Sequence, residues 1–192
     1  MNTLIVLLIR HGQTVANVKG LIQGQGDTPL TDIGKKSTII KSNKLRFFDI
    51  SAVYCSDLGR AVRTYEILHE TQQSLPEANF NSELREIDFG DLTFGRKDEL
   101  IEAIFHHRAC PEQRYPHGEG GNDLAARIQK FYDDLFNRHM GQTLLVVSHY
   151  GVIESSVRLY TDYPAEQPVI LKEEDVLELK FDGSRRATLS IF

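Results

Sequence analysis

The chain has 192 residues, a length that fits one domain of ordinary size. Hydrophobic residues make up 41% of it and charged residues 26%, a globular composition that excludes disorder as the main state. Lysine and arginine number 22 against 27 aspartates and glutamates, so the net charge is -5. This charge gives no general attraction to nucleic acid or to an anionic membrane, and any anion site has to be built locally.

The cysteines and the longest apolar run indicate the compartment. Two cysteines, Cys55 and Cys110, cannot form a disulfide framework and suit a reducing environment. The apolar run at residues 4–9 is far shorter than the ~20 residues that span a bilayer. It also has no basic segment before it and no small-residue cleavage site after it. We therefore expect a cytoplasmic protein.

Three mainly apolar runs, at residues 4–9, 50–55 and 143–147, predict strands of a parallel sheet, because nearly continuous apolar runs are typical of strands buried on both faces. Helical patterns lie between them, at residues 31–46, 57–71 and 122–140. The candidate N-caps of these helices are Thr31, Ser56 or Asp57, and Asn122. Strands that alternate with helices predict an α/β fold with a doubly wound, mostly parallel sheet flanked by helices.

Two segments depart from this alternation. Residues 77–117 are less regular, with a short helix predicted at 98–105, and we expect them to form a covering insertion or lid within a single domain of residues 1–192. Residues 176–181 and 187–192 flank a polar turn and predict a β-hairpin or strand pair at the edge of the sheet.

Basic side chains follow the predicted strands. Arg10 and His11 come directly after the first strand, and His149 follows the strand at 143–147. Since ligands of open α/β sheets bind beyond the carboxyl ends of the strands, the two histidines can share one pocket. Arg60 lies in the first turn of the helix after strand 50–55 and can reach the same place. Guanidinium groups pair bidentately with phosphate oxygens, so these four residues predict a phosphate-binding site.

Short motifs occur in a fixed order along most of the chain. They are Leu8-Ile9-Arg10-His11-Gly12-Gln13-Thr14 with Asn17; Gln23-Gly24 with Asp27; Pro29-Leu30-Thr31 with Gly34; Ser56-Asp57-Leu58, Arg60-Ala61 and Thr64; Leu84-Arg85-Glu86 with Phe89-Gly90; and Val147-Ser148-His149 with Gly151. In this combination the chain resembles the histidine phosphatase superfamily, which includes cofactor-dependent phosphoglycerate mutases and many small phosphatases. The resemblance implies a phosphoglycerate mutase-like fold and favours the small phosphatase branch.

The resemblance also implies roles for individual residues. His11 would be the nucleophile that becomes phosphorylated, and Arg10, Arg60 and His149 would hold the transferred phosphoryl group. Glu86 would be the proton donor. The matches to phosphate- or substrate-binding positions are Asn17, Gln23, Gly24 and Gly151, although the amides of Asn17 and Gln23 are equally suited to capping a turn.

Three places depart from the family pattern. Leu92-Thr93-Phe94 stands where the family often has Trp-Glu-Gly, and the segment Gly118-Glu119-Gly120 has Gly where Ser is usual. Tyr150 follows His149 where Gly is common, which places a bulky phenol close to the predicted pocket. We expect these changes to affect the shape of the pocket and to restrict substrate size.

These observations together predict a phosphatase that needs no metal and no cofactor, because phosphoryl transfer depends mainly on positioning and fixed positive charge. The expected ligand is a small phosphorylated metabolite and the expected product is inorganic phosphate. We expect neither nucleic acid nor a membrane as a partner, and a homodimer is compatible with the sequence. The alternatives are a cofactor-dependent phosphoglycerate mutase and a non-catalytic protein that binds a phosphorylated ligand.

A zinc site is the remaining alternative for the covering segment. His106, His107, Cys110 and His117 lie close together, and His106 and Cys110 are four residues apart on a possible helix. Their spacing matches no known closed ligand set, so we expect ordinary residues of a variable loop rather than a metal site.

Overall fold

The central sheet is mostly parallel, as the alternating pattern predicts. The computed structural model describes residues 3–164 and 166–192, so positions 1, 2 and 165 of the predicted domain lie outside the description. Its strands are β1 (Leu4–Arg10), β2 (Ile50–Cys55), β3 (Ala78–Phe80), β4 (Thr143–Ser148), β5 (Leu177–Phe181) and β6 (Ala187–Ile191). The order across the sheet is β3-β2-β4-β1-β5-β6. The first four of these pair in parallel, and β5 and β6 add an antiparallel edge.

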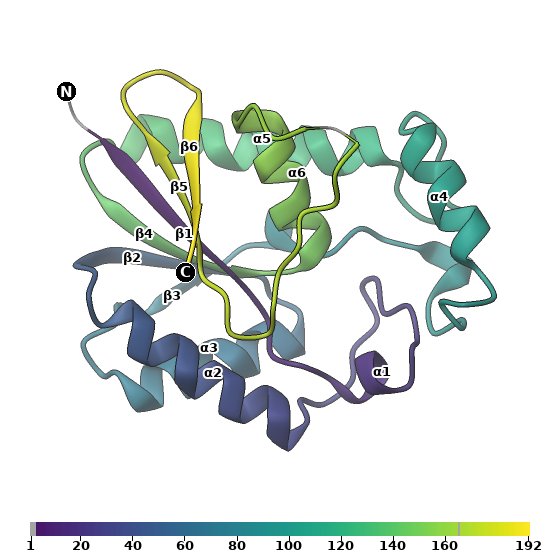
Figure 1. Cartoon of the computed structure of the whole chain (residues 1–192), viewed down its shortest axis with the longest axis horizontal. Helices are drawn as coiled ribbons and strands as arrows, with labels where there is room; N and C mark the ends of the chain where they lie inside the picture. Colours follow the sequence, from purple (N-terminus) through teal and green to yellow (C-terminus); the bar gives the residue numbers. More distant parts are fainter. Residues whose placement is uncertain (1–2, 165) are drawn as a thin grey trace.

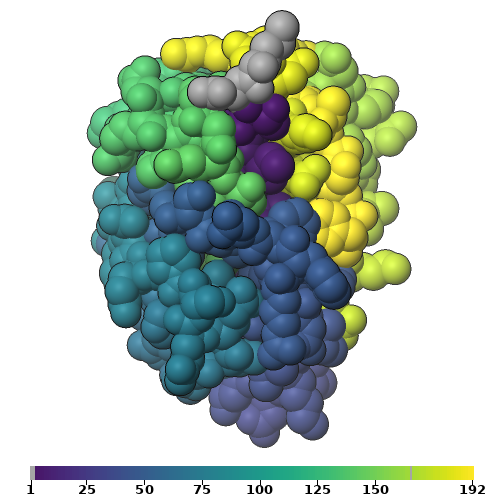
Figure 2. Space-filling model, turned by 90° about the vertical axis from the view of Figure 1, so that its left-hand side faces the viewer, coloured from purple at the N-terminus to yellow at the C-terminus, as the bar shows by residue number. Residues whose placement is uncertain are grey.

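Helices cover both faces of this sheet (Figure 1). They are α1 (Val15–Val18), α2 (Asp32–Leu45), α3 (Gly59–Thr71), α4 (Ile101–Ala109), α5 (Gly121–Arg138) and α6 (Tyr150–Tyr160). Helices α2 and α3 lie against one face and α5 and α6 against the other, while α1 and α4 lie beyond the carboxyl ends of β1 and β4. Figure 2 shows the opposite end, where the start of β1 lies between the chain that leads into β4 and the C-terminal strands. The predicted doubly wound α/β fold is confirmed.

The apolar run of β1 is buried on both faces, which explains why no position in it is polar before Arg10. Leu4, Val6 and Leu8 pack in the cluster that contains α5 and α6 side chains. Leu7 and Ile9 pack in the cluster that contains α2 and α3 side chains. Burial on alternate sides of one strand joins two hydrophobic layers into a single core.

Helix α2 is capped by a residue next to it in the sequence, whereas helix α3 is capped by a residue from a distant loop. Thr31 caps α2 as predicted, since its hydroxyl accepts a backbone N–H of the first turn. The prediction that Ser56 or Asp57 caps α3 is wrong, because the helix begins two residues later and its cap position makes no side-chain hydrogen bond. The carboxylate of Asp27, from a distant loop, accepts the backbone N–H of Arg60 instead, with both oxygens at 3.2 Å.

The remaining elements follow the predictions in part. Helix α5 begins at Gly121, so Asn122 lies inside the helix and the prediction that it is the N-cap is wrong. The helix predicted at 98–105 lies three residues later, as α4. The segment 77–117 also contains β3, at the edge of the sheet, and two 3-10 turns, η1 (Ser82–Leu84) and η2 (Gly90–Leu92). The C-terminal hairpin is confirmed as β5 and β6.

Among residues 3–164 and 166–192, no helix combines the length and the apolar character that crossing a bilayer requires.

Candidate active site

The register between β1 and β4 brings the two histidines together. Arg10 pairs with Ser148 in the parallel ladder, and the backbone N–H of His11 donates to the Ser148 carbonyl at 2.9 Å. His11 and His149 therefore leave the sheet side by side, and their ring centroids are 5.1 Å apart. The strand-end arrangement predicted from the sequence thus places both imidazoles in one buried spot.

The imidazole of His11 is held in one tautomer. Its Nδ1 lies 2.8 Å from the Gly12 carbonyl oxygen, which can only accept, so Nδ1 carries the proton. Its Nε2 accepts from the Arg60 Nε at 3.1 Å. Burial lowers the pKa of His11 well below its ordinary value, and the charges of Arg10 and Arg60 lower it further. At neutral pH the ring is neutral, with the Nε2 lone pair directed at the cluster of positive charge.

Arg60 is fixed by a loop on the opposite side from His11. Its two terminal nitrogens donate to the carbonyls of Gly24 and Gly26, each at 2.7 Å. Gly24 has a φ of 52°, in the left-handed region that favours glycine, and this conformation turns its carbonyl toward the guanidinium. The loop therefore holds a buried cation in place, and its Asp27 carboxylate, 3.4 Å from one terminal nitrogen, forms an ion pair with the guanidinium.

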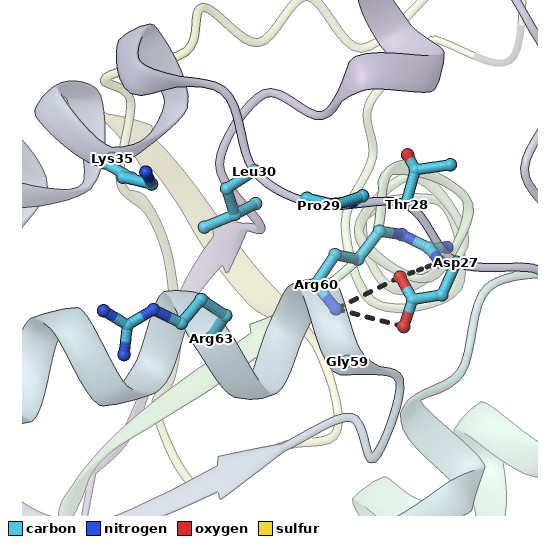
Figure 3. Close-up of a pocket in the computed structure, with 8 residues that line it drawn as sticks. All are labelled: Asp27, Thr28, Pro29, Leu30, Lys35, Gly59, Arg60 and Arg63. Atoms are coloured by element: carbon cyan, nitrogen blue, oxygen red, sulfur yellow. Dashed lines mark hydrogen bonds and ion pairs between the residues drawn. The ribbon is translucent and has the colours of Figure 1, made fainter.

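An open groove of about 430 Å³ lies between this loop and the start of α3 (Figure 3). Arg60 links the groove to the histidines, because its Nε donates to His11 while its backbone N–H and one terminal nitrogen donate to Asp27 in the groove. The lining residues are Asp27, Thr28, Pro29, Leu30, Lys35, Gly59, Arg60 and Arg63.

His149 makes a contact that the sequence analysis did not identify. Its Nε2 lies 2.8 Å from the Ser56 hydroxyl, which follows β2. Burial lowers the pKa of His149 well below its ordinary value, with further lowering by Arg60, His11 and Arg10. The Nδ1 of His149 and the Nε of Arg10 are buried without a hydrogen-bond partner among the described residues. Because buried polar atoms usually have partners, these two are suited to ligand oxygens.

A buried lysine lies directly behind the site. The Lys41 side chain is 1% exposed, and its Nζ donates to the Arg10 carbonyl at 2.7 Å. Burial lowers its pKa to about 8, so it is charged at neutral pH. Its charge also contributes to the lowered pKa of His11. The sequence analysis missed Lys41, since a lysine within a helical pattern is usually exposed.

Glu86 lies next to the turn that follows His149. Its Oε1 accepts the backbone N–H of Ile87 at 3.0 Å and that of Gly151 at 3.1 Å, and its Oε2 lies 3.2 Å from the same Gly151 nitrogen. A Cβ atom at position 151 would lie 2.2 Å from Oε1. Glycine is therefore required at 151 for the carboxylate to occupy this position, and this is where the structure places the predicted site residue Gly151.

Asn17 and Gln23 make local contacts in the structure. The Asn17 Oδ1 accepts the backbone N–H of Thr14 at 3.0 Å and so completes a cap on α1. The buried Gln23 Oε1 accepts the Thr28 hydroxyl at 3.0 Å. Both side chains thus stabilise loops close to the histidines, as the turn-capping alternative describes, and their contact with a phosphoryl group stays a prediction.

Two family departures also lie near the site. Phe94 adopts a φ of 64°, and its ring packs where a Cβ on Gly26 would otherwise stand. Tyr150 is half-buried, with the Arg108 guanidinium of α4 5.9 Å from its ring centroid. Their effect on substrate size stays a prediction.

The residues of the zinc alternative take other partners. His106 Nε2 lies 2.8 Å from the Gln113 side-chain oxygen, and the His117 ring pairs with Asp91. The His107 ring packs against Tyr115 at a tilt of 40°, with ring centroids 4.0 Å apart. Within residues 3–164 and 166–192, no three histidine, cysteine or acidic side chains are grouped closely enough to hold a metal ion.

Comparison with known proteins identifies the family. The model of a family described as the histidine phosphatase superfamily (branch 1) matches residues 6–191. This chain belongs to the histidine phosphatase superfamily. The resemblance inferred from the sequence motifs is confirmed, and the chain is an enzyme of the histidine phosphatase type.

Individual members of the histidine phosphatase superfamily show how far the likeness extends. A Salmonella arizonae protein named "Probable phosphoglycerate mutase GpmB" is 34% identical over 149 residues, which cover 75% of this chain and 68% of the relative. The crystal structure of the alpha-ribazole phosphatase from Shigella flexneri is 29% identical, with a TM-score of 0.80, and the match covers 98% of this chain and 95% of that one. The phosphoglycerate mutase of Bacillus anthracis has a TM-score of 0.84 at 20% identity, over 100% of this chain and 93% of that one, which shows a shared fold.

Proposed function

We propose that this protein hydrolyses small-molecule phosphomonoesters without a metal ion, through a phosphohistidine intermediate on His11. The observation that carries the proposal is the state of the His11 imidazole. Its Nδ1 proton is held by the Gly12 carbonyl, and burial keeps the ring neutral, so Nε2 is a nucleophile at neutral pH. Its lone pair accepts a hydrogen bond from the Arg60 Nε, so phosphorus takes the place of that hydrogen, and Arg60 and the adjacent His149 then donate to the phosphoryl oxygens.

The proposed reaction has two displacements. In the first, His11 Nε2 attacks phosphorus, the bond from phosphorus to the ester oxygen breaks, and Glu86 gives its proton to the departing alkoxide. In the second, a water molecule attacks the phosphohistidine, Glu86 takes a proton from that water, and the bond from phosphorus to nitrogen breaks. Inorganic phosphate is released, and His11 and Glu86 return to their starting states.

Fixed positive charge supports both displacements. The transferred phosphoryl group carries negative charge on three equatorial oxygens, and Arg10 and Arg60 lie beside the histidine that receives it. Lys41 adds a third cation, which is buried behind Arg10. Because these charges are already positioned, they stabilise the transition state without reorganisation, as preorganised electrostatic catalysis requires.

The substrate that we propose is a small phosphorylated metabolite. Phosphatases of such substrates occur among the structures that this chain resembles, including the alpha-ribazole phosphatase. We also propose the cytoplasm as the compartment, on the basis of two free cysteines, Cys55 and Cys110.

The test is phosphate release from p-nitrophenyl phosphate in excess chelator. We expect turnover that survives the chelator, is lost in His11→Ala, and is unchanged in the control His106→Ala, which removes an exposed imidazole. Rapid quenching during turnover is expected to trap one phosphoryl group per chain on His11. Activity that persists in His11→Ala, or that disappears with chelator and returns with a divalent ion, would refute the proposal.

A mutase is the second candidate, and the 34% identical relative named as a phosphoglycerate mutase favours it. A mutase returns the phosphoryl group from histidine to a second hydroxyl rather than to water. Isomerisation of 3-phosphoglycerate that depends on a bisphosphate primer, and that exceeds phosphate release, would support the mutase over the phosphatase.

A further inference from the structure

The segment that carries Glu86 has little regular structure of its own. Residues 86–89 lie between the 3-10 turns η1 and η2 and belong to no helix or strand. Backbone groups outside regular structure need other partners when they are partly buried, and a side chain on such a segment is only as well placed as those partners are. The position of the Glu86 carboxylate therefore depends on what holds its backbone.

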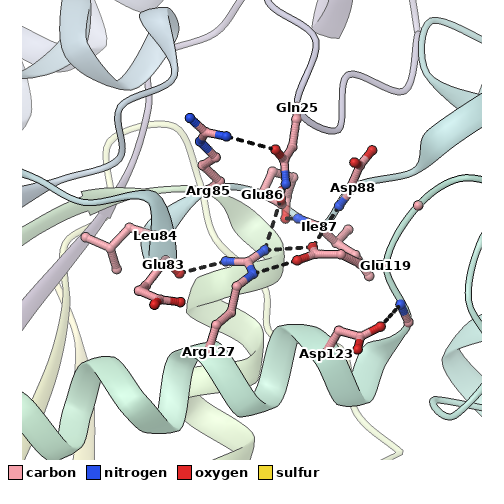
Figure 4. A network of polar contacts seen from close by, with 12 residues as sticks. Gln25, Glu83, Leu84, Arg85, Glu86, Ile87, Asp88, Glu119, Asp123 and Arg127 are labelled. Atoms are coloured by element: carbon pink, nitrogen blue, oxygen red, sulfur yellow. Dashed lines mark hydrogen bonds and ion pairs between the residues drawn. The ribbon is translucent and has the colours of Figure 1, made fainter.

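An ion pair between Glu119 and Arg127 holds this backbone (Figure 4). The Arg127 guanidinium donates to the carbonyl oxygens of Glu83 at 2.6 Å and of Glu86 at 3.1 Å. The Glu119 carboxylate accepts the backbone N–H of Asp88 at 2.9 Å. The two charged groups thus bond the segment before, at and after Glu86, and they bond each other twice at 3.0 Å.

Both side chains of this pair are hydrogen-bonded to the segment and are largely buried. Four hydrogen bonds engage Arg127, and a guanidinium has five N–H groups in all. The side chains of Arg127 and Glu119 are only 12% and 18% exposed. Hydrogen bonds to charged groups are about twice as strong as neutral ones, so this pair holds the backbone more firmly than solvent or neutral side chains would.

The backbone of Glu119 reinforces the contact. Its N–H donates to the Asp88 carbonyl at 2.8 Å. A Cβ atom on Gly118 would lie 2.4 Å from that same carbonyl oxygen, so the approach is open only to glycine. A third attachment comes from β4, where the Ser148 hydroxyl donates to the Leu84 carbonyl at 2.8 Å.

We propose that Glu119 and Arg127 are positioning residues of the reaction: their ion pair fixes the backbone around Glu86 and thereby directs its carboxyl group at the oxygen of the leaving group. This inference rests on the proposed function, in which Glu86 donates the proton. It assigns the pair a role in proton transfer to the leaving group, and none in binding the phosphoryl group.

The dependence of the rate on the leaving group tests the proposal. Alkyl phosphates need a proton on the departing oxygen, whereas 2,4-dinitrophenolate departs without one. For Arg127→Gln and Glu119→Gln we expect kcat/KM, which reports the first displacement alone, to fall at least tenfold on an alkyl phosphate and less than twofold on 2,4-dinitrophenyl phosphate. The Kd of inorganic phosphate should be unchanged in both variants.

Each variant is compared with itself on two substrates, so a partly unfolded sample lowers both rates equally and leaves their ratio unchanged. Lys130→Gln is the matched control. It lies on the same helix and pairs with the side chain of Glu83, and we expect it to leave the ratio at the wild-type value. The double variant of Glu119 and Arg127 should lose no more than Arg127→Gln, because the two residues act as one unit.

Equal losses on both substrates, or no loss on the alkyl phosphate, would overturn the positioning role. Glu86→Gln separates this failure from a failure of the proposed function. If Glu86→Gln lowers kcat/KM on the alkyl phosphate alone while the Arg127 and Glu119 variants do not, only the positioning role is wrong. If Glu86→Gln shows no dependence on the leaving group, the proton-donor assignment fails, and the positioning role fails with it.

Discussion

Because Gly151 is in contact with Glu86, adding a single methyl group at position 151 tests whether the position of the proposed proton donor, Glu86, matters. In Gly151→Ala the new Cβ atom would lie 2.2 Å from the Glu86 Oε1, whereas ordinary van der Waals contact begins near 3.4 Å. The carboxylate oxygen therefore has to move by about 1 Å. A misplacement of about 1 Å in a reacting group can lower a rate by about 100-fold.

Stability is expected to respond differently from activity. Alanine favours a helix interior over glycine by up to about 1 kcal/mol, and Gly151 lies in the first turn of α6. The lost hydrogen bond between its N–H and Glu86 costs about 1 kcal/mol, so the two changes nearly cancel. We expect an unfolding free energy within about 1 kcal/mol of the wild type.

The assay is steady-state phosphate release from an alkyl phosphate, together with urea unfolding of the same samples. We expect kcat to fall about 100-fold with little change in KM, because the arginines and histidines around the phosphoryl position are untouched. Ser155→Ala, on the same helix, should behave as the wild type. A Gly151→Ala enzyme with kcat within twofold of the wild type would show that this position of Glu86 is not needed for the reaction.

Three further predictions follow from the buried polar groups. Because the pKa values of His11 and His149 are lowered in the fold from 6.5, only the unfolded chain gains their protons as pH falls below about 6.5. The free energy of unfolding is therefore highest above that pH and falls below it, by up to about 1.4 kcal/mol per pH unit for each histidine. Urea unfolding of the His11→Asn/His149→Asn variant should not show this fall. Lys41 has a pKa of about 8 in the fold against 10.5 in the unfolded chain, so the free energy of unfolding should rise as pH increases from 8 to 10.5. An equal rise in Lys41→Met would contradict this prediction. Ser56→Ala removes the partner of His149 and should lower kcat/KM roughly fivefold, or about 1 kcal/mol, in the same phosphatase assay.

The strands and the convergence of the basic residues could be predicted because their signals are local. A strand buried on both faces is apolar at nearly every position, and β1 from its start and β4 after Thr143 are apolar until the sequence turns polar at Arg10 and Ser148. The rule that parallel strands end at the same edge then brings His11 and His149 together. The position of Arg60 after the strand at 50–55 added it to the same place, and the family motifs added Glu86, which composition and periodicity alone would not have linked.

The partners of these residues could not be predicted, because they come from distant segments. Asp27 replaces the expected cap of α3 from a loop more than 30 residues earlier in the chain, and no local pattern indicates that contact. Arg127 lies on α5 among polar residues, and its burial follows from the path of the segment around Glu86. Charged side chains on amphipathic helices are usually solvated, so the pattern gave no reason to place Arg127 inside.

Helix α2 shows the limit of periodicity most clearly. Its inward face contains polar residues, among them Thr38 and Lys41, while Ile33 and Ile39 are exposed. The Thr38 hydroxyl donates to the carbonyl of Gly34 within the helix, so it can be buried without a cost in unpaired groups. An apolar-inside rule would have oriented this helix the wrong way and would have placed Lys41 in solvent.

The attachment of the site to the centre of the sheet has a consequence for its dynamics. The backbone N–H of His11 is bonded to Ser148 across β1 and β4, and that of Ser56 is bonded to Val147 across β2 and β4, each at 2.9 Å. Neither bond can open unless the central strands separate, which amounts to unfolding the whole domain. These two amides are therefore expected to be among the slowest protons of the molecule to exchange with deuterium, at a rate that reports the free energy of global unfolding.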